Sequence, residues 1–431
     1  MDSPQVVGQP GAWAGPATAV ARMFQDPPGA YLHVPFCSRI CPFCPYNKVL
    51  PRGDLPARYF QALRTEVARY REAGLPGPEG FTSVYVGGGT PTLFLDELES
   101  VLAAVPTSGE RAVEVLPTHV DRLPALRAMG VDAVSIGAQS LDDRLLRRLR
   151  RPHDAATALA AIRAAVGTFP LVDVDLIVDA ETEGDAQLRG TFLRDLATCL
   201  DLGADQVSAY PLMRFGYTPF GRARHDRRRE HALLARATEL AAARGYERRS
   251  VWTFNRLGSP GYSSITRRRF VGMGAGASSF AGADFLVNHF GLDAYIAALD
   301  DDRLPIAHRL HLGAAGGAAY EAFWQAYAGR IVPAELAASP GARAVVRGMC
   351  QPLRLTGLVT DEGGRFALTA AGFDVFHDLE RAVTYALIEP LWAQMLDEQR
   401  REGRAAWVDE GRARRGLAWR AVDRVLARPT P

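Results

Sequence analysis

Three cysteines in one short loop constrain this chain more than any other feature of its sequence. Cys37, Cys41 and Cys44 form a C-x3-C-x2-C array directly after a short apolar run at 30–36. Thiolates at this spacing can converge on one compact iron–sulfur cluster. A [4Fe–4S] cluster takes four ligands, whereas this loop offers three, so one iron would stay open for a small molecule.

The alternatives are a zinc loop or three unrelated thiols. Zinc sites usually pair two closely spaced cysteine knuckles or add histidines at fixed spacing. The other two of the five cysteines, Cys199 and Cys350, stand alone in apolar helical sequence. The available ligands therefore favour the cluster. Because such thiolates need reducing conditions, we expect a cytoplasmic protein.

Short β-rich runs alternate with helix-length amphipathic segments between residues 30 and 255. The predicted strands are 30–36, 82–86, 111–116, 131–136, 172–178 and 206–212. This alternation implies a parallel sheet whose strands are buried on both faces. About six such units predict an α/β fold, a partial (β/α)6 barrel, with its chemistry at the carboxyl ends of the strands.

The notable motifs all lie in these strands or at their carboxyl ends. Cys37 follows the first strand, Gly87 ends the second, Glu114 lies in the third, Gln139 follows the fourth and Asp175 lies in the fifth. Because the carboxyl ends of parallel strands share one edge of the sheet, we expect these residues to form a single site.

The sequence predicts three regions: a flexible segment at 1–29, the barrel at 30–290 and a smaller, mostly helical domain at 291–431. Segments 355–360 and 365–369 predict a short β-hairpin in that last domain, which we expect to cover the barrel mouth. The segment 270–279 is interpreted as a small-residue loop, and the tail beyond Glu398 as a charged surface helix.

A winged DNA-binding domain is the alternative for the C-terminal region. The hairpin region is not basic enough for that role, and the net charge of +2 argues neither for nor against nucleic acid. We therefore expect no nucleic acid partner. We also expect no membrane span, because no apolar stretch approaches roughly 20 residues, and no secretory signal is evident.

With Phe43 before the third cysteine, the loop resembles the C-x3-C-x-[aromatic]-C signature of radical S-adenosylmethionine (radical SAM) enzymes. The run from Tyr31 to Cys37, Y-L-H-V-P-F-C, and the Asn47-Lys48 pair are more narrowly similar to the oxygen-independent coproporphyrinogen III oxidase family. The similarity extends from about residue 30 to 290 and more weakly to 385. It implies a [4Fe–4S] cluster and S-adenosylmethionine as cofactors.

Cofactor-binding residues follow from the same resemblance. The G-G-G-T-P-T loop at 87–92 would bind the methionine amine, Arg151 the carboxylate and Asp175 the ribose, while Glu114 and Gln139 match further cofactor contacts. The implied cofactor-binding set is Tyr31, Phe43, Gly88, Gly89, Thr90, Glu114, Gln139, Arg151 and Asp175. The implied catalytic set is Tyr31 with the metal ligands Cys37, Cys41 and Cys44.

Two departures from the family pattern bear on the reaction. The family follows its aspartate strand with Gly-Leu-Pro, where this chain has Val178-Asp-Ala-Glu181. The oxidases tend to have Gly-Cys after the third cysteine, where this chain has Pro45-Tyr46. Both favour a class C methylase, in which a second S-adenosylmethionine supplies a methyl group to an sp² carbon of an aromatic or heterocyclic small molecule.

Two other reactions of the family are open to the same fold. A coproporphyrinogen III oxidase would decarboxylate propionates in haem biosynthesis and would need basic residues, for which Arg39, Arg214 and Arg267–Arg269 are candidates. A haem chaperone would keep the cluster and deliver haem. For the enzymes, the resemblance implies a small-molecule substrate and an external one-electron donor such as flavodoxin or ferredoxin.

Overall fold

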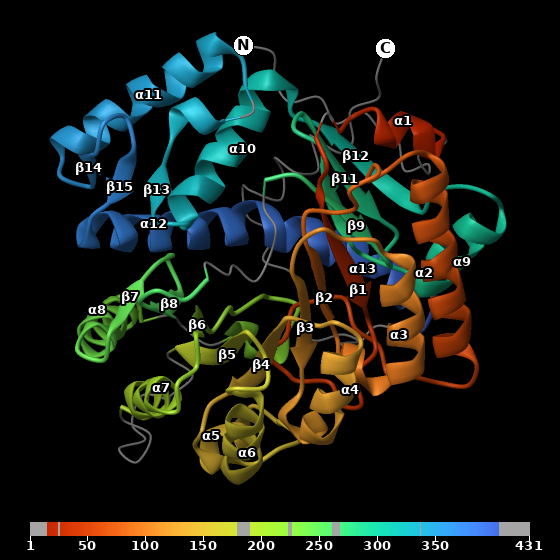
Figure 1. The fold of residues 1–431 in the computed structure, drawn as a ribbon, viewed down its shortest axis with the longest axis horizontal. Coiled ribbons are helices and arrows are strands. Elements are labelled where there is room, and N and C mark those ends of the chain that lie inside the picture. Colours follow the sequence, from red (N-terminus) through yellow and green to blue (C-terminus); the bar gives the residue numbers. More distant parts are fainter. Residues whose placement is uncertain are drawn as a thin grey trace.

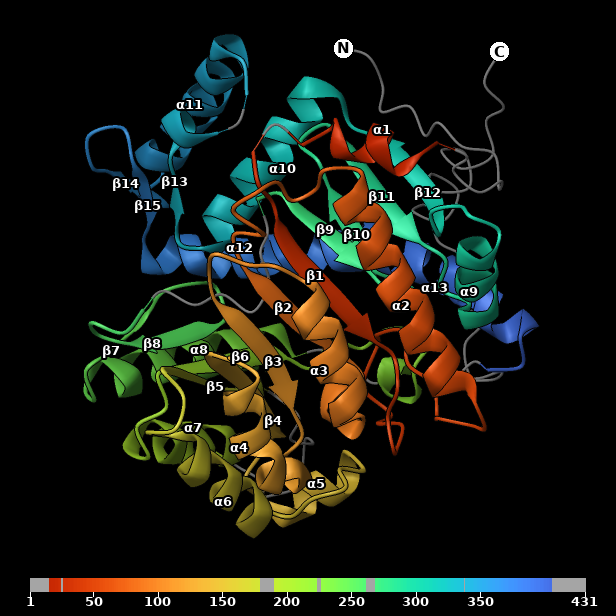
Figure 2. The same ribbon diagram turned by 45° about the vertical axis from the view of Figure 1, so that its right-hand side comes forward.

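The computed structural model describes residues 15–24, 26–178, 190–222, 226–260, 268–336 and 338–404. Its centre is a sheet of twelve strands in the order β12-β11-β10-β9-β1-β2-β3-β4-β5-β6-β8-β7. A second sheet, β13-β15-β14, belongs to the C-terminal region. Figures 1 and 2 show the large sheet with helices outside it and the C-terminal region above it.

Six parallel strands pair in chain order and form the partial (β/α)6 barrel that the sequence predicts. They are β1 (Gly29–Val34), β2 (Val84–Gly88), β3 (Arg111–Val115), β4 (Ala133–Gln139), β5 (Leu171–Val178) and β6 (Gln206–Pro211). The helices of these units are α2 (Leu55–Glu72), α3 (Leu95–Ala104), α4 (Leu123–Ala128), α5 (Asp143–Arg148), α6 (Ala155–Ala165), α7 (Thr191–Asp201) and α8 (Arg227–Ala242). Short 3-10 helices lie at Pro91–Leu93, Pro117–Arg122, Pro219–Arg222 and Pro333–Glu335.

Strand β5 shows why the two faces of the sheet differ. Val172, Val174 and Leu176 are fully buried and belong to the core cluster that also contains Ile162 of α6. Because side chains alternate between the faces of a strand, the residues between them lie on the opposite face. That inner face carries the polar residues of the barrel.

The sheet extends beyond the barrel at both edges. On one side β9 (Phe270–Met273) pairs in parallel with β1, and β10 (Ser278–Phe280), β11 (Asp284–Asn288) and β12 (Ile306–His311) follow antiparallel. On the other, β8 (Thr253–Arg256) and β7 (Tyr246–Arg248) follow β6. The predicted loop at 270–279 is therefore partly strand, and the sheet continues past residue 290.

The N-terminal lead-in is not wholly irregular where the structure describes it. Residues Ala17–Ala21 form the short helix α1, and Val20 is buried in the main core.

Helix α9 (Leu292–Asp300) packs against α2. Among the residues described, no helix is long and apolar enough to cross a bilayer.

The C-terminal region is mostly helical and contains the predicted hairpin. It consists of α10 (Gly313–Tyr327), β13 (Arg330–Ile331), α11 (Pro340–Leu355), β14 (Val359–Asp361), β15 (Phe366–Leu368), α12 (Ala370–Val383), the π-helical turn η5 (Thr384–Ile388) and α13 (Glu389–Arg401). Strands β14 and β15 form the hairpin, and β13 adds a third strand. Helix α12, η5 and α13 run on as one long helix across the middle of the molecule, blue in Figure 1.

The predicted surface helix beyond Glu398 falls mostly outside the described residues, and within 399–404 it is only partly exposed. Gln399 is fully buried, and its side-chain amide donates to the Oδ1 of Asn47 in the cysteine loop. The carboxylate of Glu402 accepts the backbone N–H of Leu292 at 2.9 Å and that of Ala294 at 3.1 Å, in the first turn of α9. The charged sequence had concealed residues that attach the helix to the barrel.

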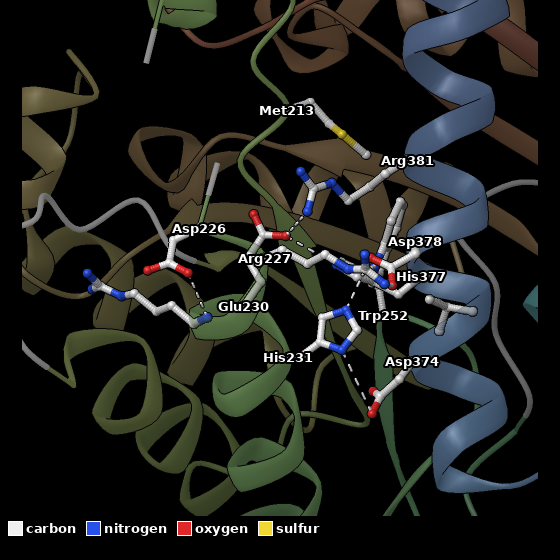
Figure 3. Close-up of polar contacts among 12 residues, drawn as sticks. Met213, Asp226, Arg227, Glu230, His231, Trp252, Asp374, His377, Asp378 and Arg381 are labelled. Atoms are coloured by element: carbon white, nitrogen blue, oxygen red, sulfur yellow. Dashed lines mark hydrogen bonds and ion pairs between the residues drawn. The ribbon is translucent and has the colours of Figure 1, made fainter. Parts of the chain in front are cut away.

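Polar side chains hold α12 against α8 and β8 at the other end of this long helix (Figure 3). The buried carboxylate of Glu230 accepts hydrogen bonds from Arg381 Nη1 at 2.5 Å and from His377 Nε2 at 3.2 Å. The indole N–H of Trp252 donates to His377 Nδ1 at 2.9 Å. These hydrogen bonds satisfy the Glu230 carboxylate, both ring nitrogens of His377 and the indole N–H of Trp252, as a buried polar network requires.

A buried carboxyl group also connects α2 with the extension of the sheet. Glu66 accepts the backbone N–H of Gly274 at 2.8 Å, the Asn288 amide at 2.9 Å and the Tyr295 hydroxyl at 2.6 Å. Burial raises the pKa of Glu66 to about 7. Because the pKa of an unfolded glutamate is about 4.3, the folded protein holds this proton more tightly than the unfolded chain does.

We predict that the contribution of Glu66 to stability falls as the pH rises from about 4 to about 7, because the unfolded chain releases this proton at a lower pH than the folded protein does. The measurement is the thermal midpoint of the wild type minus that of Glu66→Gln across this range. The exposed Glu72→Gln of the same helix is the control and should give a flat difference. A flat difference for Glu66→Gln as well would contradict the prediction.

Candidate active site at the carboxyl ends of the strands

The cysteine loop leaves β1 and is fixed by backbone hydrogen bonds at its two ends. The N–H of Cys37 donates to Val49 O at 3.0 Å, and the N–H of Val49 donates to Pro35 O at 2.7 Å. Inside the loop, the buried ammonium of Lys48 donates to the carbonyl of Cys44 at 2.5 Å and to that of Tyr46 at 3.0 Å. The three thiols are therefore attached to a well-ordered turn.

Burial disfavours the ionised form of two of these thiols, Cys37 and Cys44. It raises the pKa of Cys37 to about 12, and the Cys44 thiol raises it further while Lys48 lowers it. Burial also raises the pKa of Cys44. Buried thiols of this kind become thiolates when a metal cation compensates their charge.

The three sulfurs do not all lie within 4.8 Å of one another. In the described part of the chain, the one group of three or more potential ligands whose atoms all lie within 4.8 Å of one another is found elsewhere. This spacing argues against the zinc alternative, because the ligands of a tetrahedral zinc ion lie within about 4 Å of one another. A larger polynuclear cluster suits the spacing better.

The glycine-rich loop after β2 lies directly against the cysteine loop. The N–H of Gly89 donates to Val34 O and that of Thr90 donates to Phe36 O, both at 2.7 Å. Gly88 has φ +112°, and a Cβ there would lie 2.5 Å from the His33 ring. A Cβ at Gly89 would lie 2.5 Å from Phe36 O. Only glycine allows this close approach of the two loops.

Tyr31 of β1 lies on the same inner face. Its hydroxyl is 2.8 Å from His33 Nδ1, and its ring stacks on that of Tyr85 with centroids 6.2 Å apart. Burial raises the pKa of Tyr31 well above its usual value, and the Glu114 carboxyl adds to this effect. Because His33 Nε2 contacts the carbonyl oxygen of Asn47 at 2.9 Å, Nε2 carries the proton and Nδ1 accepts from Tyr31.

Glu114 of β3 approaches the glycine-rich loop. Its carboxylate accepts the Tyr85 hydroxyl at 2.9 Å and the N–H of Gly88 at 3.1 Å. Burial raises its pKa. Tyr85 was not predicted as a site residue, because it lies in an apolar strand with no motif around it. Its hydrogen bond to Glu114 depends on the pairing of β2 with β3.

Gln139 and Arg151 converge near the end of β4. Gln139 has φ +68°, at the point where the pairing of β4 with β5 shifts register. Arg151 donates from Nη2 to Gly137 O at 2.5 Å and from Nη1 to Cys41 Sγ at 3.4 Å. A Cβ at Gly137 would lie 3.3 Å from the Gln139 amide and 3.4 Å from Arg151 Nη2. The buried Nε of Arg151 has no hydrogen-bond partner.

Two aspartates of β5 lie side by side on the inner face. Asp175 accepts the Ser135 hydroxyl of β4 at 3.0 Å, and Asp173 accepts the Ser208 hydroxyl of β6 at 2.8 Å. Burial raises the pKa of Asp173 to about 7. Burial and the neighbouring Asp173 raise the pKa of Asp175 well above its usual range. Asp173 was missed, although an acidic residue two positions before Asp175 in an apolar strand was a usable signal.

The structure thus brings the predicted site residues to the carboxyl edge of β1–β5. Phe43 packs with Leu145, Ile177 and Leu212 beside the third cysteine. Thr90 is buried and lowers the pKa of Cys37 through its side chain. The predicted change of turn after Asp175 falls largely on residues outside the described ranges.

A second set of potential metal ligands lies apart from this edge, in the network of Figure 3. It comprises His231, His377 and Asp378. His377 Nδ1 accepts from Trp252 and its Nε2 therefore carries the proton that faces Glu230. Neither nitrogen has a free lone pair for a metal. Asp378 pairs instead with Arg227 and His231, so this set holds α12 in place.

Comparison with known proteins agrees with the fold. Residues 31–189 match the radical SAM superfamily. The chain is 33% identical over 321 residues to the haem chaperone HemW of Mycobacterium tuberculosis, an alignment that covers 68% of this chain and 80% of that protein. It is 37% identical over 232 residues to the bovine mitochondrial radical S-adenosyl methionine domain-containing protein 1, covering 51% of this chain and half of that protein's length.

The fold matches that of coproporphyrinogen III oxidase (HemN) from Escherichia coli, with a TM-score of 0.70 and 20% identity over 84% of this chain and 91% of that one. The oxygen-independent coproporphyrinogen III oxidase of Bradyrhizobium diazoefficiens is 28% identical over 314 residues, covering 64% of this chain and 68% of that protein. The chain belongs to the radical SAM superfamily, among the relatives of HemW and the oxygen-independent coproporphyrinogen III oxidases.

Proposed function

We propose that this protein is an enzyme that reductively cleaves S-adenosylmethionine at a [4Fe–4S] cluster bound by Cys37, Cys41 and Cys44. The observation that carries the proposal is the meeting of the cysteine loop, the glycine-rich loop and Arg151 at one edge of the sheet. When bound, the two cofactors supply a 5′-deoxyadenosyl radical that abstracts hydrogen from carbon. An external one-electron donor and a small-molecule substrate complete the reaction.

The residues present suit these cofactors. Burial raises the pKa of the Cys37 and Cys44 thiols, and a polynuclear cation would offset this effect. The Nε of Arg151 is buried beside Cys41 and lacks a partner, so this guanidinium has a donor available for a carboxylate. Gly88 and Gly89 leave backbone amides and carbonyls uncovered by side chains.

Each side chain then has a distinct part in the proposed site. Arg151 would hold the methionine carboxylate, and the backbone around Gly88–Thr90 the amine. Asp175, whose raised pKa favours the protonated form, would contact the ribose hydroxyls. Glu114 and Gln139 would position the remainder of the cofactor, and Tyr31 would lie between it and the cysteine loop. Together these groups orient the cofactor and exclude water from it.

For the reaction that follows, we propose methyl transfer to an sp² carbon of an aromatic or heterocyclic small molecule, with a second S-adenosylmethionine as the methyl source. The arginines considered for propionate binding weigh against decarboxylation. Arg269 pairs with Asp26 and Arg268 donates to Glu335 O; both precede β9, which runs parallel to β1, and so lie at the edge opposite the cysteine loop. Arg267 lies outside the described residues.

Haem handling is the second candidate. The similarity to the haem chaperone HemW, over 80% of that protein's length, favours it. A chaperone would use the same cluster loop without turning over S-adenosylmethionine. Coproporphyrinogen III oxidation is the third possibility and has Arg39 and Arg214 as the remaining basic residues.

We expect Cys37→Ala, Cys41→Ala and Cys44→Ala each to abolish the iron content and the visible absorption of anaerobically reconstituted protein. Three ligands already leave one iron without a protein ligand, so the loss of another should release the cluster. Cys199→Ala and Cys350→Ala, which remove buried thiols elsewhere, should retain both signals. An unchanged spectrum in any of the first three variants would refute the ligand assignment.

Replacing Arg151 should weaken the binding of S-adenosylmethionine. We expect Arg151→Met to raise the dissociation constant by about 10- to 100-fold, the worth of a charge-assisted hydrogen bond. Arg151→Lys should lose less because it keeps the charge. Equilibrium binding to the reconstituted protein, with iron content measured in parallel, gives the result. Arg147→Met, at an exposed position of α5, is the matched control, and equal affinities for Arg151→Met and the control would contradict the role.

The reduced protein should convert S-adenosylmethionine to 5′-deoxyadenosine. With the CD₃-labelled cofactor and dithionite, methyl transfer predicts S-adenosylhomocysteine as a second product and deuterium in the 5′-deoxyadenosine. Release of carbon dioxide from coproporphyrinogen III would show that the reaction is decarboxylation and would contradict methylation. Tight haem binding without any cofactor cleavage would favour the chaperone and overturn the enzymatic proposal.

A further inference from the structure

We infer that Tyr46 of the cysteine loop and Trp392 of α13 form a binding platform for a planar aromatic substrate. Their ring centroids are 5.8 Å apart, with an angle of 54° between the planes. Tyr46 follows the proposed ligand Cys44 by two residues. The inference builds on the proposed function, because it names the class of molecule that would be held beside the cluster.

The exposure of Tyr46 is the first observation. Its side chain is 51% exposed, and no other aromatic residue in the described ranges is exposed to that degree. The residues that follow it, Asn47 and Lys48, are buried. A large aromatic ring exposed directly before three buried residues, 47–49, is a feature typical of a binding surface.

The backbone that carries these rings is fixed, so their exposure is not a result of loose packing. The carbonyl of Tyr46 accepts from the Lys48 ammonium at 3.0 Å, and that of Pro45 accepts from the Tyr217 hydroxyl at 3.2 Å. The side chain of Asn47 is bound by the buried Gln399, two turns along α13 from Trp392. The two segments are therefore joined next to the ring pair by hydrogen bonds that do not involve the rings.

Trp392 in turn rests on a second aromatic layer. Its indole stacks on Phe215, with centroids 6.0 Å apart and 17° between the planes. Phe215 also contacts Tyr217 at 5.4 Å and Tyr385 at 6.1 Å. This layer fixes the plane of the indole, and the half-exposed phenol ring tilts away from it at 54°. Two rings in this arrangement offer an aromatic face and an aromatic edge to a third, flat molecule.

The chemistry of the surface selects a planar aromatic ligand. The surface consists of the amphipathic rings of Tyr46 and Trp392. These rings bind another π-system more favourably, by stacking and edge-to-face contacts, than they bind a saturated ring. Such contacts would hold a flat molecule beside the cysteine loop, where an sp² carbon is the proposed target. Simple closure of the interface between α13 and the loop does not explain the platform, because the hydrogen bond from Gln399 to Asn47 already joins the two segments.

The test measures binding of quinoline-2-carboxylate to anaerobically reconstituted protein that is saturated with S-adenosylmethionine and kept unreduced. Decahydroquinoline-2-carboxylate, its saturated counterpart, has the same carboxylate and a similar size. The wild type should bind the planar probe at least about fivefold more tightly than the saturated one. Tyr46→Leu and Trp392→Leu should each reduce affinity for the planar probe about five- to tenfold and remove the preference, whereas Tyr46→Phe should retain it.

Leu50→Ala is the matched control, because Leu50 is 40% exposed in the same loop. This variant should bind both probes as the wild type does. Iron content measured in every variant separates a lost platform from a damaged cluster. Equal affinity of the wild type for the two probes would overturn the inference. Unchanged binding of the planar probe to both Tyr46→Leu and Trp392→Leu would overturn it as well.

Failure of the inference and failure of the proposed function give different results. Wild-type protein that prefers the planar probe but forms no 5′-deoxyadenosine on reduction would refute the enzymatic proposal and leave the platform standing. Protein that cleaves S-adenosylmethionine but does not discriminate between the probes would refute the platform alone.

Discussion

The pairing of β1 with β2 determines where every part of the site lies. In this parallel register Val34 is opposite Gly88, and two backbone hydrogen bonds of 2.7 Å continue the pairing past the strand ends, from Gly89 to Val34 and from Thr90 to Phe36. The cysteine loop and the glycine-rich loop are therefore extensions of one ladder. A side chain at Gly89 would collide with the carbonyl of Phe36. The contact between the two loops therefore requires glycine at this position.

Charge is the second constraint on the same edge of the sheet. Three thiols and the carboxyl groups of Glu114, Asp173 and Asp175 lie here, with the buried Lys48 beside Cys44 and the half-buried Arg151 beside Cys41. Burial raises the pKa of each carboxyl group, which limits the negative charge that accumulates there. This matters for a cluster that must accept an electron, because nearby anions oppose its reduction. Hydrogen bonds from Tyr85, Ser135 and Ser208 to these carboxyls compensate part of the cost of burying them.

The sequence revealed the parts of the protein whose signals are local. Cysteine spacing and apolar runs of strand length predicted the cluster loop, six strands of the barrel and the edge at which the site lies. Strands β9 and β10 were not predicted, because the segment 270–280 contains Gly272, Gly274 and Gly276 and few of the β-branched or aromatic residues that mark strands. Contacts over long separations were also inaccessible: Gln399 and Asn47 are 352 residues apart. Patterning describes one element at a time, whereas this pair depends on the whole chain having folded.

The C-terminal helix changes how the site should be understood. The sequence predicted a separate domain that covers the mouth of a partial barrel, whereas the long helix formed by α12, η5 and α13 is attached to the barrel at both ends. Glu230 and His377 hold one end to α8, and Glu398 accepts the N–H of Gly291 near the other at 3.0 Å. Between these anchors α13 places Trp392 beside Tyr46. Because the loop that carries the cysteines is itself bound by this helix through Asn47, its geometry depends on the C-terminal region, and variation in α13 can alter the substrate surface while the cysteines stay the same.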